Sequence, residues 1–158
     1  MRIAIDAMGG DHAPDEIVAG ALEAVAQLGK DDEVILVGPQ ETVHAKLDEF
    51  GSSGASRPTV VDAPDVIAMD ESPIDSLRAK PRSSIGILAK LAKLNEADAV
   101  ISAGNTGACV AAFQMRMRNL PGVNRPGIAV VFPMNAGPVI ICDVGANIAC
   151  KPIHLYQY

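Results

Sequence analysis

Residues 3–14 read Ile-Ala-Ile-Asp-Ala-Met-Gly-Gly-Asp-His-Ala-Pro, and they decide the fold because they contain a strand, a turn and a helix start in succession. The apolar run from Ile3 to Ile5 ends at Asp6, and the glycine pair Gly9-Gly10 then indicates a turn. Pro14 suits the first position of a helix, where its missing N–H costs no hydrogen bond. This succession is typical of the units that build an open α/β sheet.

The alternation of strands and helices continues along the chain. In the first helix, apolar residues recur at helical spacing from Ile17 to Leu28, and Gly29 predicts its end. Further strands are predicted at Val34–Val37, Thr59–Val61 and Asp98–Ser102, and further helices at Glu41–Phe50, from Ser83 or Ser84 to about Asn95, and from Ala108 to Asn119. The segments between them read as a surface loop at 51–56, an irregular acidic stretch at Asp62–Asp75 and a turn at Gly104–Gly107. We therefore expect an α/β fold with a mostly parallel sheet.

Two more strands are predicted close together near the carboxyl end, at Ile128–Val131 and Val139–Asp143. They flank a turn at Asn135–Pro138, and this spacing is compatible with a hairpin. A hairpin would place an antiparallel element in an otherwise parallel sheet. Another helix is expected to begin after Pro152.

The composition is that of a globular protein with an aliphatic core. Of 158 residues, 49% are hydrophobic and 20% charged, which argues against disorder. Aromatic residues make up 3% and tryptophan is missing, so a parallel sheet covered by helices fits better than an aromatic-rich sandwich. After Met1 and Arg2, only three apolar residues precede Asp6, so we expect no targeting segment. The most apolar stretch, 127–142, contains two prolines and an asparagine, so we expect no membrane span.

The three cysteines do not predict a disulfide framework or a zinc site. Cys109, Cys142 and Cys150 are odd in number and lack metal-ligand spacing. We expect buried, inert thiols in a reducing cytoplasm.

The net charge of −6 is unevenly distributed. Residues 1–75 carry 4 basic and 16 acidic groups, a balance of −12, whereas residues 76–125 carry 8 basic and 2 acidic groups, a balance of +6. A generic nucleic-acid binder would be basic overall, so we expect no nucleic-acid partner. The basic middle could receive an anionic ligand or an acidic protein. For Lys90 and Lys93, a solvated helix face is the competing interpretation.

Three strand ends share one pattern, in which an apolar strand is followed by Asp or Ser and then by a glycine-containing turn. They are residues 6–11 (Asp-Ala-Met-Gly-Gly-Asp), 102–107 (Ser-Ala-Gly-Asn-Thr-Gly) and 143–147 (Asp-Val-Gly-Ala-Asn). Such turns lie at the carboxyl ends of strands, where ligands of open α/β sheets bind, and the free N–H groups of a helix start attract phosphate. None of them is the dinucleotide motif G-x-G-x-x-G or a P-loop, and turn geometry alone could explain each one.

Taken together, these strings resemble the signatures of the PlsX family of phosphate acyltransferases. The resemblance covers nearly the whole chain, in the family's order: residues 5–14, 78–84, 102–108, Arg125-Pro126, 143–147 and Cys150-Lys151-Pro152. One departure is Ala149, where the family pattern has an acidic residue that could help to orient Lys151. Because members of the family are longer, we expect residues 1–158 to be the amino-terminal portion of a single α/β catalytic domain, incomplete at the carboxyl end.

The resemblance implies a fold and an activity. PlsX enzymes transfer a fatty acyl group from acyl carrier protein to inorganic phosphate, giving acyl phosphate for phospholipid synthesis. Their three-layer, Rossmann-like sandwich resembles the isocitrate/isopropylmalate dehydrogenase and phosphotransacetylase group. The resemblance further implies a cytoplasmic homodimer that can associate peripherally with the inner face of the membrane, with no cofactor.

In such a reaction phosphate is the nucleophile, so the site has to bind and position it and to stabilise an oxyanion. The candidate phosphate cradle comprises the N–H groups of the glycines and the side chains nearby: Asp6, Gly9, Gly10, Ser102, Gly104, Asn105, Thr106, Gly107, Asp143 and Asn147. Asp6 and Asp143 are expected to orient loop N–H groups, since a carboxylate placed against phosphate would repel it. No metal-ligand set is evident in the sequence.

The candidate catalytic residues are His12, Lys80, Asn105 and Lys151. Lys80 and Lys151 could counter the charge of phosphate or of the oxyanion, although Lys80 could simply be solvated. His12 could act as a general base or oxyanion donor, or could hydrogen-bond to Asp11 or Asp15. Ser83 and Ser84 are candidate ligands, but either could instead cap the helix that follows them.

Acyl carrier protein is acidic, which gives the basic middle of the chain a possible role. Its candidate docking residues are Arg78, Arg82, Arg116, Arg118 and Arg125. Two alternatives stay open: a phosphotransacetylase-like enzyme that uses acyl-CoA, and an inactive phosphate-binding fragment. A metal- and NAD-dependent dehydrogenase is disfavoured because no aspartate cluster is evident.

Overall fold

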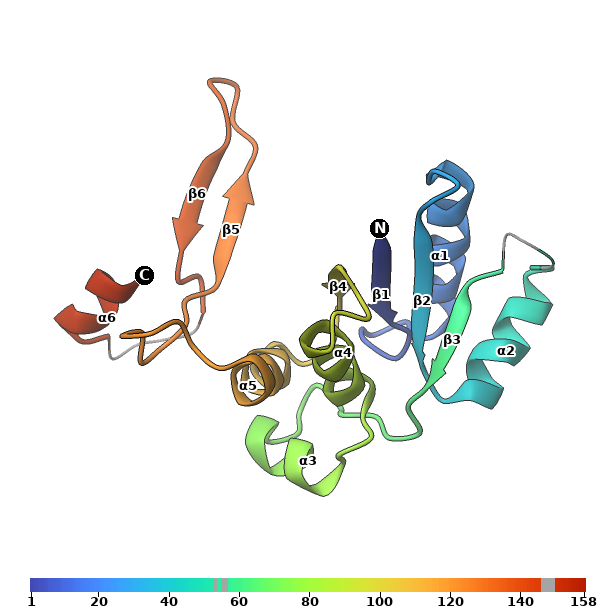
Figure 1. Ribbon diagram of the computed structural model, residues 1–158, viewed down its shortest axis with the longest axis horizontal. Helices are drawn as coiled ribbons and strands as arrows, with labels where there is room; N and C mark the ends of the chain where they lie inside the picture. The colour runs from blue at the N-terminus through green and yellow to red at the C-terminus, as the bar shows by residue number, and fades with distance from the viewer. Residues whose placement is uncertain (53, 55–56, 146–149) are drawn as a thin grey trace. The chain divides into compact units, whose positions relative to one another are not determined.

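The computed structural model describes residues 1–158 except 53, 55–56 and 146–149, and it comprises two compact units (Figure 1). The first unit, Met1–Met117, contains β1 (Arg2–Asp6), α1 (Asp15–Gln27), β2 (Glu33–Gly38), α2 (Gln40–Glu49), β3 (Thr59–Asp62), α3 (Pro73–Ala79), α4 (Ser84–Lys93), β4 (Ala99–Ile101) and α5 (Thr106–Met117). The second unit, Arg118–Tyr158, contains β5 (Ala129–Phe132), β6 (Val139–Cys142) and α6 (Pro152–Gln157).

The first unit is built on a four-stranded sheet in the order β3-β2-β1-β4, with every pair of neighbours parallel. The chain adds β2 and β3 on one side of β1, and β4 then pairs with the other side. The order of addition therefore reverses between β1 and β4, as at the switch point of a doubly wound fold. The predicted α/β class and mostly parallel sheet are confirmed.

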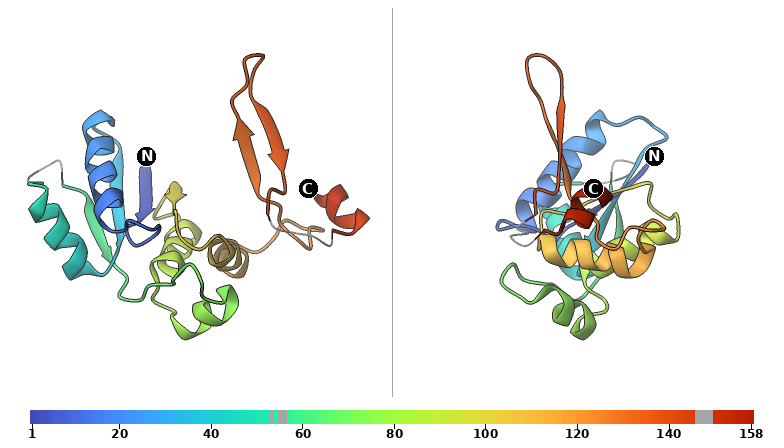
Figure 2. Two further views of the ribbon diagram at one scale, coloured as in Figure 1. Left: turned by 180° about the vertical axis from the view of Figure 1, so that it is seen from behind. Right: turned by 90° about the vertical axis from the view of Figure 1, so that its left-hand side faces the viewer.

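Helices cover both faces of this sheet, because successive side chains of a strand point to opposite faces. On β2, Val34 and Leu36 pack in a cluster with residues of α1 and α2, while Ile35 and Val37 pack in another cluster with Leu88 of α4. Figure 2 shows α1 and α2 beside the strands on one side and α4 on the other. The result is the expected three-layer sandwich.

A third apolar cluster joins α3, α4 and α5 and includes Ile85, Ala89, Ala108 and Ala112. Here the sequence prediction was partly wrong, because α3 begins inside the stretch expected to be irregular. In addition, α5 begins at Thr106 rather than Ala108, since the side chain of Asn105 accepts a hydrogen bond from the Ala108 N–H and thereby caps the helix earlier.

The second unit contains the predicted hairpin, with β5 and β6 antiparallel and Ala129 opposite Cys142. Gly137, with φ of 116°, lies in the connecting turn, where its N–H donates to the Met134 carbonyl (3.0 Å). Within this unit the hairpin forms a two-stranded sheet, and the antiparallel element that it would add to the parallel sheet stays a prediction. Among the described residues, no helix has the length and apolar character needed to cross a membrane.

The cysteine prediction also needs correction. Cys142, at the end of β6, and Cys150, just before α6, are exposed and not buried. Of the three cysteines, Cys109 is the one that is partly buried, and burial raises the pKa of its thiol.

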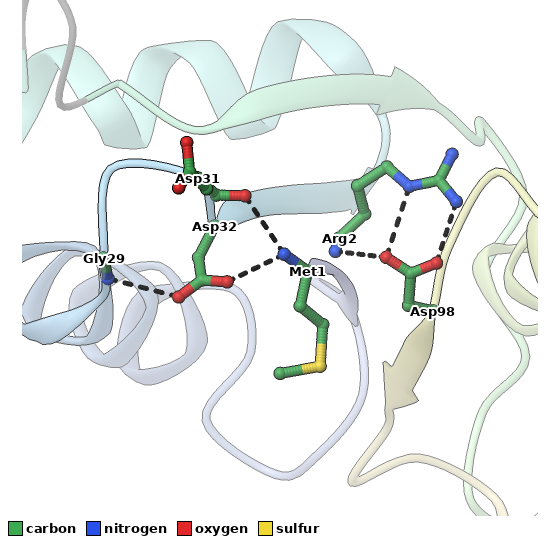
Figure 3. A network of polar contacts seen from close by, with 6 residues as sticks. All are labelled: Met1, Arg2, Gly29, Asp31, Asp32 and Asp98. Atoms are coloured by element: carbon green, nitrogen blue, oxygen red, sulfur yellow. Dashed lines mark hydrogen bonds and ion pairs between the residues drawn. The ribbon is translucent and has the colours of Figure 1, made fainter.

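The start of β1 is held by polar contacts at both sides (Figure 3). The amino group of Met1 donates to Asp32 Oδ1 (2.7 Å) and to the Asp31 carbonyl (3.0 Å), just before β2. Asp98, just before β4, accepts hydrogen bonds from the Arg2 backbone N–H (2.7 Å) and guanidinium (2.8 Å). These contacts fix the amino ends of three neighbouring strands.

Acid should weaken this arrangement. The Arg2 guanidinium, and then the Arg2 backbone N–H, lower the pKa of Asp98 from 3.8 to about 2. Because the folded-state pKa is the lower one, the stabilisation is complete above about pH 4 and is lost as the pH falls toward 2. We expect Asp98→Asn to lower the urea midpoint at pH 7 and to have a smaller effect at pH 3. Asp70→Asn is the control, since Asp70 is exposed and has no side-chain partner among the described residues. Equal midpoint changes at the two pH values would contradict this prediction.

Candidate functional site

The carboxyl ends of β1 and β4 lie side by side at the switch point, so the loops that follow them meet there. The first loop holds Gly9 and Gly10, and the second holds Gly104 and leads into α5. Two of the three predicted glycine-rich strand ends are thus brought together by the sheet.

Asp6 connects the two loops. Its side chain is 1% exposed, and its Oδ2 accepts a hydrogen bond from the Ser102 hydroxyl (2.7 Å) while its Oδ1 accepts one from the Met8 N–H (3.1 Å). The Ser102 hydroxyl oxygen in turn accepts from the Gly104 N–H (3.1 Å). Asp6 therefore orients loop N–H groups, as the sequence predicted for a strand-end carboxylate.

Ser102→Ala should remove this connection. The variant loses one hydrogen bond to a carboxylate and one from a backbone N–H, so we expect destabilisation of about 1–2 kcal/mol by urea denaturation. Ser52→Ala provides a matched control, because the buried Ser52 hydroxyl has no hydrogen-bond partner among the described residues. If the two variants unfold at the same urea concentration, the Asp6–Ser102 contact does not stabilise the loops.

The backbones of the two loops approach so closely that glycine is required. A methyl group on Gly9 would lie 2.8 Å from Gly104 N and 2.8 Å from Asp6 Oδ2, and one on Gly104 would lie 3.4 Å from Gly9 Cα. Gly10 has φ of 115°, in the region that favours glycine. The N–H groups of Gly9 and Gly104 are used within the loops, bonded to Asp6 O and Ser102 Oγ. Of the four predicted glycine donors, Gly10 and Gly107 have N–H groups with no acceptor among the described residues, so these two are available to a ligand.

Asn105 stands at the amino end of α5 and is 6% exposed. Its Nδ2 donates to three carbonyls, those of Ala68 (3.2 Å), Met69 (3.3 Å) and Glu71 (3.1 Å), and its Oδ1 accepts from the Ala108 N–H (3.0 Å). The sequence predicted that this amide would donate to phosphate, but in the structure its hydrogens are directed at the 68–71 turn. Thr106 and Gly107 follow it, exposed, in the first helical turn, where N–H groups have no intrahelical acceptor.

The ammonium group of Lys80 also donates hydrogen bonds within the protein. Its Nζ donates to Glu71 Oε1 (2.5 Å) and to the Val66 carbonyl (2.7 Å). The hydrogen bond from Lys80, followed by those from the Ala68 N–H and the Ser76 hydroxyl, lowers the pKa of Glu71 to about 2. The predicted role of Lys80, to counter phosphate charge, would require it to leave this ion pair. Glu71 was not predicted at all.

Ser83 and Ser84 are two further candidates in the first unit, and both are buried at the start of α4. Ser83 caps α4, since its hydroxyl accepts from the Gly86 N–H (3.3 Å), and Ser83 and Ser84 are 0% and 2% exposed. The capping prediction is confirmed, and a ligand role for either hydroxyl would require the packing around them to open.

His12 is exposed and its imidazole has no partner within the described part of the chain. The same residues contain no group of three or more potential metal ligands.

Two further candidates lie in the second unit. Asp143 follows β6 with φ of 66° and its N–H donates to the Ile128 carbonyl (2.8 Å), while Lys151 is exposed at the amino end of α6. Asn147 and Ala149 lie outside the described residues. Participation of these residues in the site stays a prediction.

The arginines proposed for docking are divided between the units. Arg78 on α3 and Arg116 on α5 are exposed, and Arg82 forms an ion pair with Asp62 (2.7 Å). Arg118 and Arg125 belong to the second unit. A single docking surface that includes all five stays a prediction.

The sheet order and the loops define a class: a doubly wound α/β protein with glycine-lined loops at its switch point, suited to an anionic ligand. The model of the family described as "Fatty acid synthesis protein" matches residues 1–158. The chain belongs to this family.

Individual relatives agree with the family match. The chain is 46% identical over 159 residues to a protein of Thermosynechococcus vestitus named "Phosphate acyltransferase", covering 99% of this chain and 45% of the relative. It is 48% identical over 160 residues to a protein of that name from Nostoc punctiforme, covering 100% and 46%. With the protein of that name from Salinibacter ruber, the identity is 44% over 157 residues, covering 99% and 46%. The chain thus spans somewhat less than half the length of these relatives.

Proposed function

We propose that this chain provides the phosphate-binding part of an acyltransferase that moves a fatty acyl group from acyl carrier protein to inorganic phosphate. The observation that carries the proposal is the contact between two glycine-rich loops at the switch point, with Asp6 connecting them. The family match and the names of the relatives support this choice of reaction. The cytoplasmic location, homodimer and peripheral membrane association rest on the family resemblance alone.

In this proposal, phosphate binds to the N–H groups of Gly10 and of the first turn of α5, at Thr106 and Gly107. Asp6 does not touch phosphate, because its two oxygens are already acceptors within the loops. A phosphate oxygen attacks the thioester carbonyl carbon, and the new C–O bond gives a tetrahedral oxyanion. Collapse of this intermediate breaks the C–S bond, and the carrier's sulfur leaves as a thiolate that takes up a proton. Positioning of the anionic nucleophile is the main contribution of these residues.

Other candidate residues complete the proposal. His12, exposed beside the Gly9-Gly10 turn, is suited to act as a general base or to donate a hydrogen bond to the oxyanion. Asp143, Asn147 and Lys151 are proposed to take part in phosphate binding, with Lys151 stabilising the oxyanion. Lys80 acts indirectly, through its ion pair with Glu71.

Titration calorimetry with inorganic phosphate, combined with an assay for acyl phosphate, tests the function. We expect heat on phosphate addition, and acyl phosphate from acyl carrier protein at a higher kcat/KM than from acyl-CoA. Preference for acyl-CoA would favour a phosphotransacetylase-like enzyme. Binding without turnover would favour a phosphate-binding fragment, an alternative kept because the chain covers only 45–46% of its relatives. Absence of phosphate binding would contradict the proposal.

Charge reversal tests the proposed docking of acyl carrier protein. We expect Arg116→Glu combined with Arg118→Glu to raise the KM for acyl carrier protein about fivefold at low salt and to leave the KM for phosphate unchanged, because exposed charges mainly steer encounter. Lys30→Glu is the control, since Lys30 is an exposed cation in the acidic half of the chain. An unchanged KM for the carrier, or an equal rise in the control, would remove these arginines from the docking surface.

A further inference from the structure

Glu71 lies just before α3, and its carboxylate accepts three hydrogen bonds. Oε1 accepts from the Ala68 N–H (3.0 Å) and from Lys80 Nζ (2.5 Å), and Oε2 accepts from the Ser76 hydroxyl (2.7 Å). The hydrogen bond from the Ala68 N–H closes the 68–71 turn. The hydrogen bonds from Ser76, within α3, and from Lys80, directly after α3, connect this turn to the helix. Since Lys80 also donates to the Val66 carbonyl (2.7 Å), one ion pair holds the whole segment 66–71.

The same turn determines the orientation of Asn105. The three carbonyls that accept from Asn105 Nδ2 all belong to the 68–71 turn. Because Asn105 is 6% exposed, water cannot readily replace these acceptors. The opposite end of this amide, Oδ1, caps α5 at the Ala108 N–H. A displaced turn would therefore turn the Asn105 amide and release the cap.

We infer that Glu71 is a positioning residue for the phosphate site: it holds the 68–71 turn, the turn orients Asn105, and Asn105 fixes the first turn of α5. Lys80 belongs to this arrangement as the partner of Glu71 and does not contact phosphate. The inference rests on the proposed function, because it assigns a role within that site. The lowered pKa of Glu71 supports it, since the carboxylate stays charged at any pH suitable for an assay.

The Ala108 amide gives a readout that does not depend on phosphate. We expect Glu71→Gln to raise its hydrogen exchange rate about tenfold, because its acceptor is Asn105 Oδ1. Ser76→Ala, which removes one of the three hydrogen bonds, should give a smaller increase and serves if Glu71→Gln does not fold. Glu23→Gln, on the exposed side of α1, is the matched control and should change nothing at Ala108. An unchanged Ala108 rate in folded Glu71→Gln, or in Ser76→Ala, overturns the inference.

A double-mutant cycle then tests the role of Lys80. We expect Glu71→Gln and Lys80→Met each to weaken inorganic phosphate binding about tenfold in calorimetry, and the double variant to be no weaker than either single one. Lys80→Arg, which retains the cation, should bind phosphate nearly as the unchanged chain does. A full further loss from Lys80→Met in the Glu71→Gln background would show direct contact with phosphate and overturn the assignment of Lys80. If the unchanged chain binds no phosphate, the proposed function fails, and the Ala108 measurement still decides the positioning role.

Discussion

Gly9→Ala is expected to destabilise the chain by about 3 kcal/mol and to abolish phosphate binding, because the added methyl group has no space. It would lie 2.8 Å from both Gly104 N and Asp6 Oδ2. Neither neighbour can yield easily: Gly104 N is backbone held by Ser102 Oγ, and Asp6 is buried and holds both loops. The loops after β1 and β4 would have to separate, and the proposed cradle between them would open.

Gly20→Ala is the control for this prediction. Gly20 lies within α1, and a methyl group there meets no atom within 4 Å. Alanine in a helix interior is favoured over glycine by about 0.5–1 kcal/mol, so this variant should be more stable than the unchanged chain. Urea denaturation and phosphate calorimetry of both variants measure the two effects. If Gly9→Ala folds and binds phosphate as well as Gly20→Ala does, the close contact of the loops is not required.

Local pattern was sufficient to predict the strands of the parallel sheet and the glycine-rich loops after β1 and β4. The apolar run before Asp6 and the glycines after it identify β1 and its loop without knowledge of any partner strand. Much of α1 follows from the spacing of its apolar residues, since one stripe had to face the sheet. In contrast, α3 was missed although Ser72-Pro73, with Asp75 two residues on, is a recognisable helix start.

The connections within the site could not be predicted, because they join residues far apart in the sequence. The side chain of Asn105 donates to backbone carbonyls more than 30 residues away. Because every residue has a backbone carbonyl, the sequence does not indicate which carbonyls will accept these hydrogen bonds. Glu71 reads as one more acid in an acidic stretch until the fold places it against Lys80. The sequence suggested that Asn105 would donate to phosphate and that Lys80 would counter the charge of phosphate or of the oxyanion, whereas the structure directs both to the 66–71 segment.

Asn105→Asp should show how much this segment depends on the amide. The substitution changes one NH₂ group into an oxygen, so the Ala108 cap can persist, but a carboxylate would face three carbonyl oxygens now 3.1–3.3 Å from Nδ2. Because the side chain is 6% exposed, we expect a loss of about 3 kcal/mol at pH 7. Asn105→Ala, which only removes hydrogen bonds, should cost less, about 2 kcal/mol.

The pH dependence of Asn105→Asp separates charge repulsion from a general loss of packing. Burial against carbonyls raises the folded-state pKa of the introduced carboxyl above its unfolded value of about 3.9. The penalty is therefore small below that value, where the protonated carboxyl can donate as the amide does, and grows as the pH rises. We expect the urea midpoints of Asn105→Asp and the unchanged chain to converge between pH 7 and pH 4, while the difference for Asn105→Ala stays constant. Asn135→Asp, in the exposed hairpin turn, should have little effect at either pH. A pH-independent penalty for Asn105→Asp would mean that the three carbonyls do not hold this amide, and the connection from Glu71 to α5 would then be lost as well.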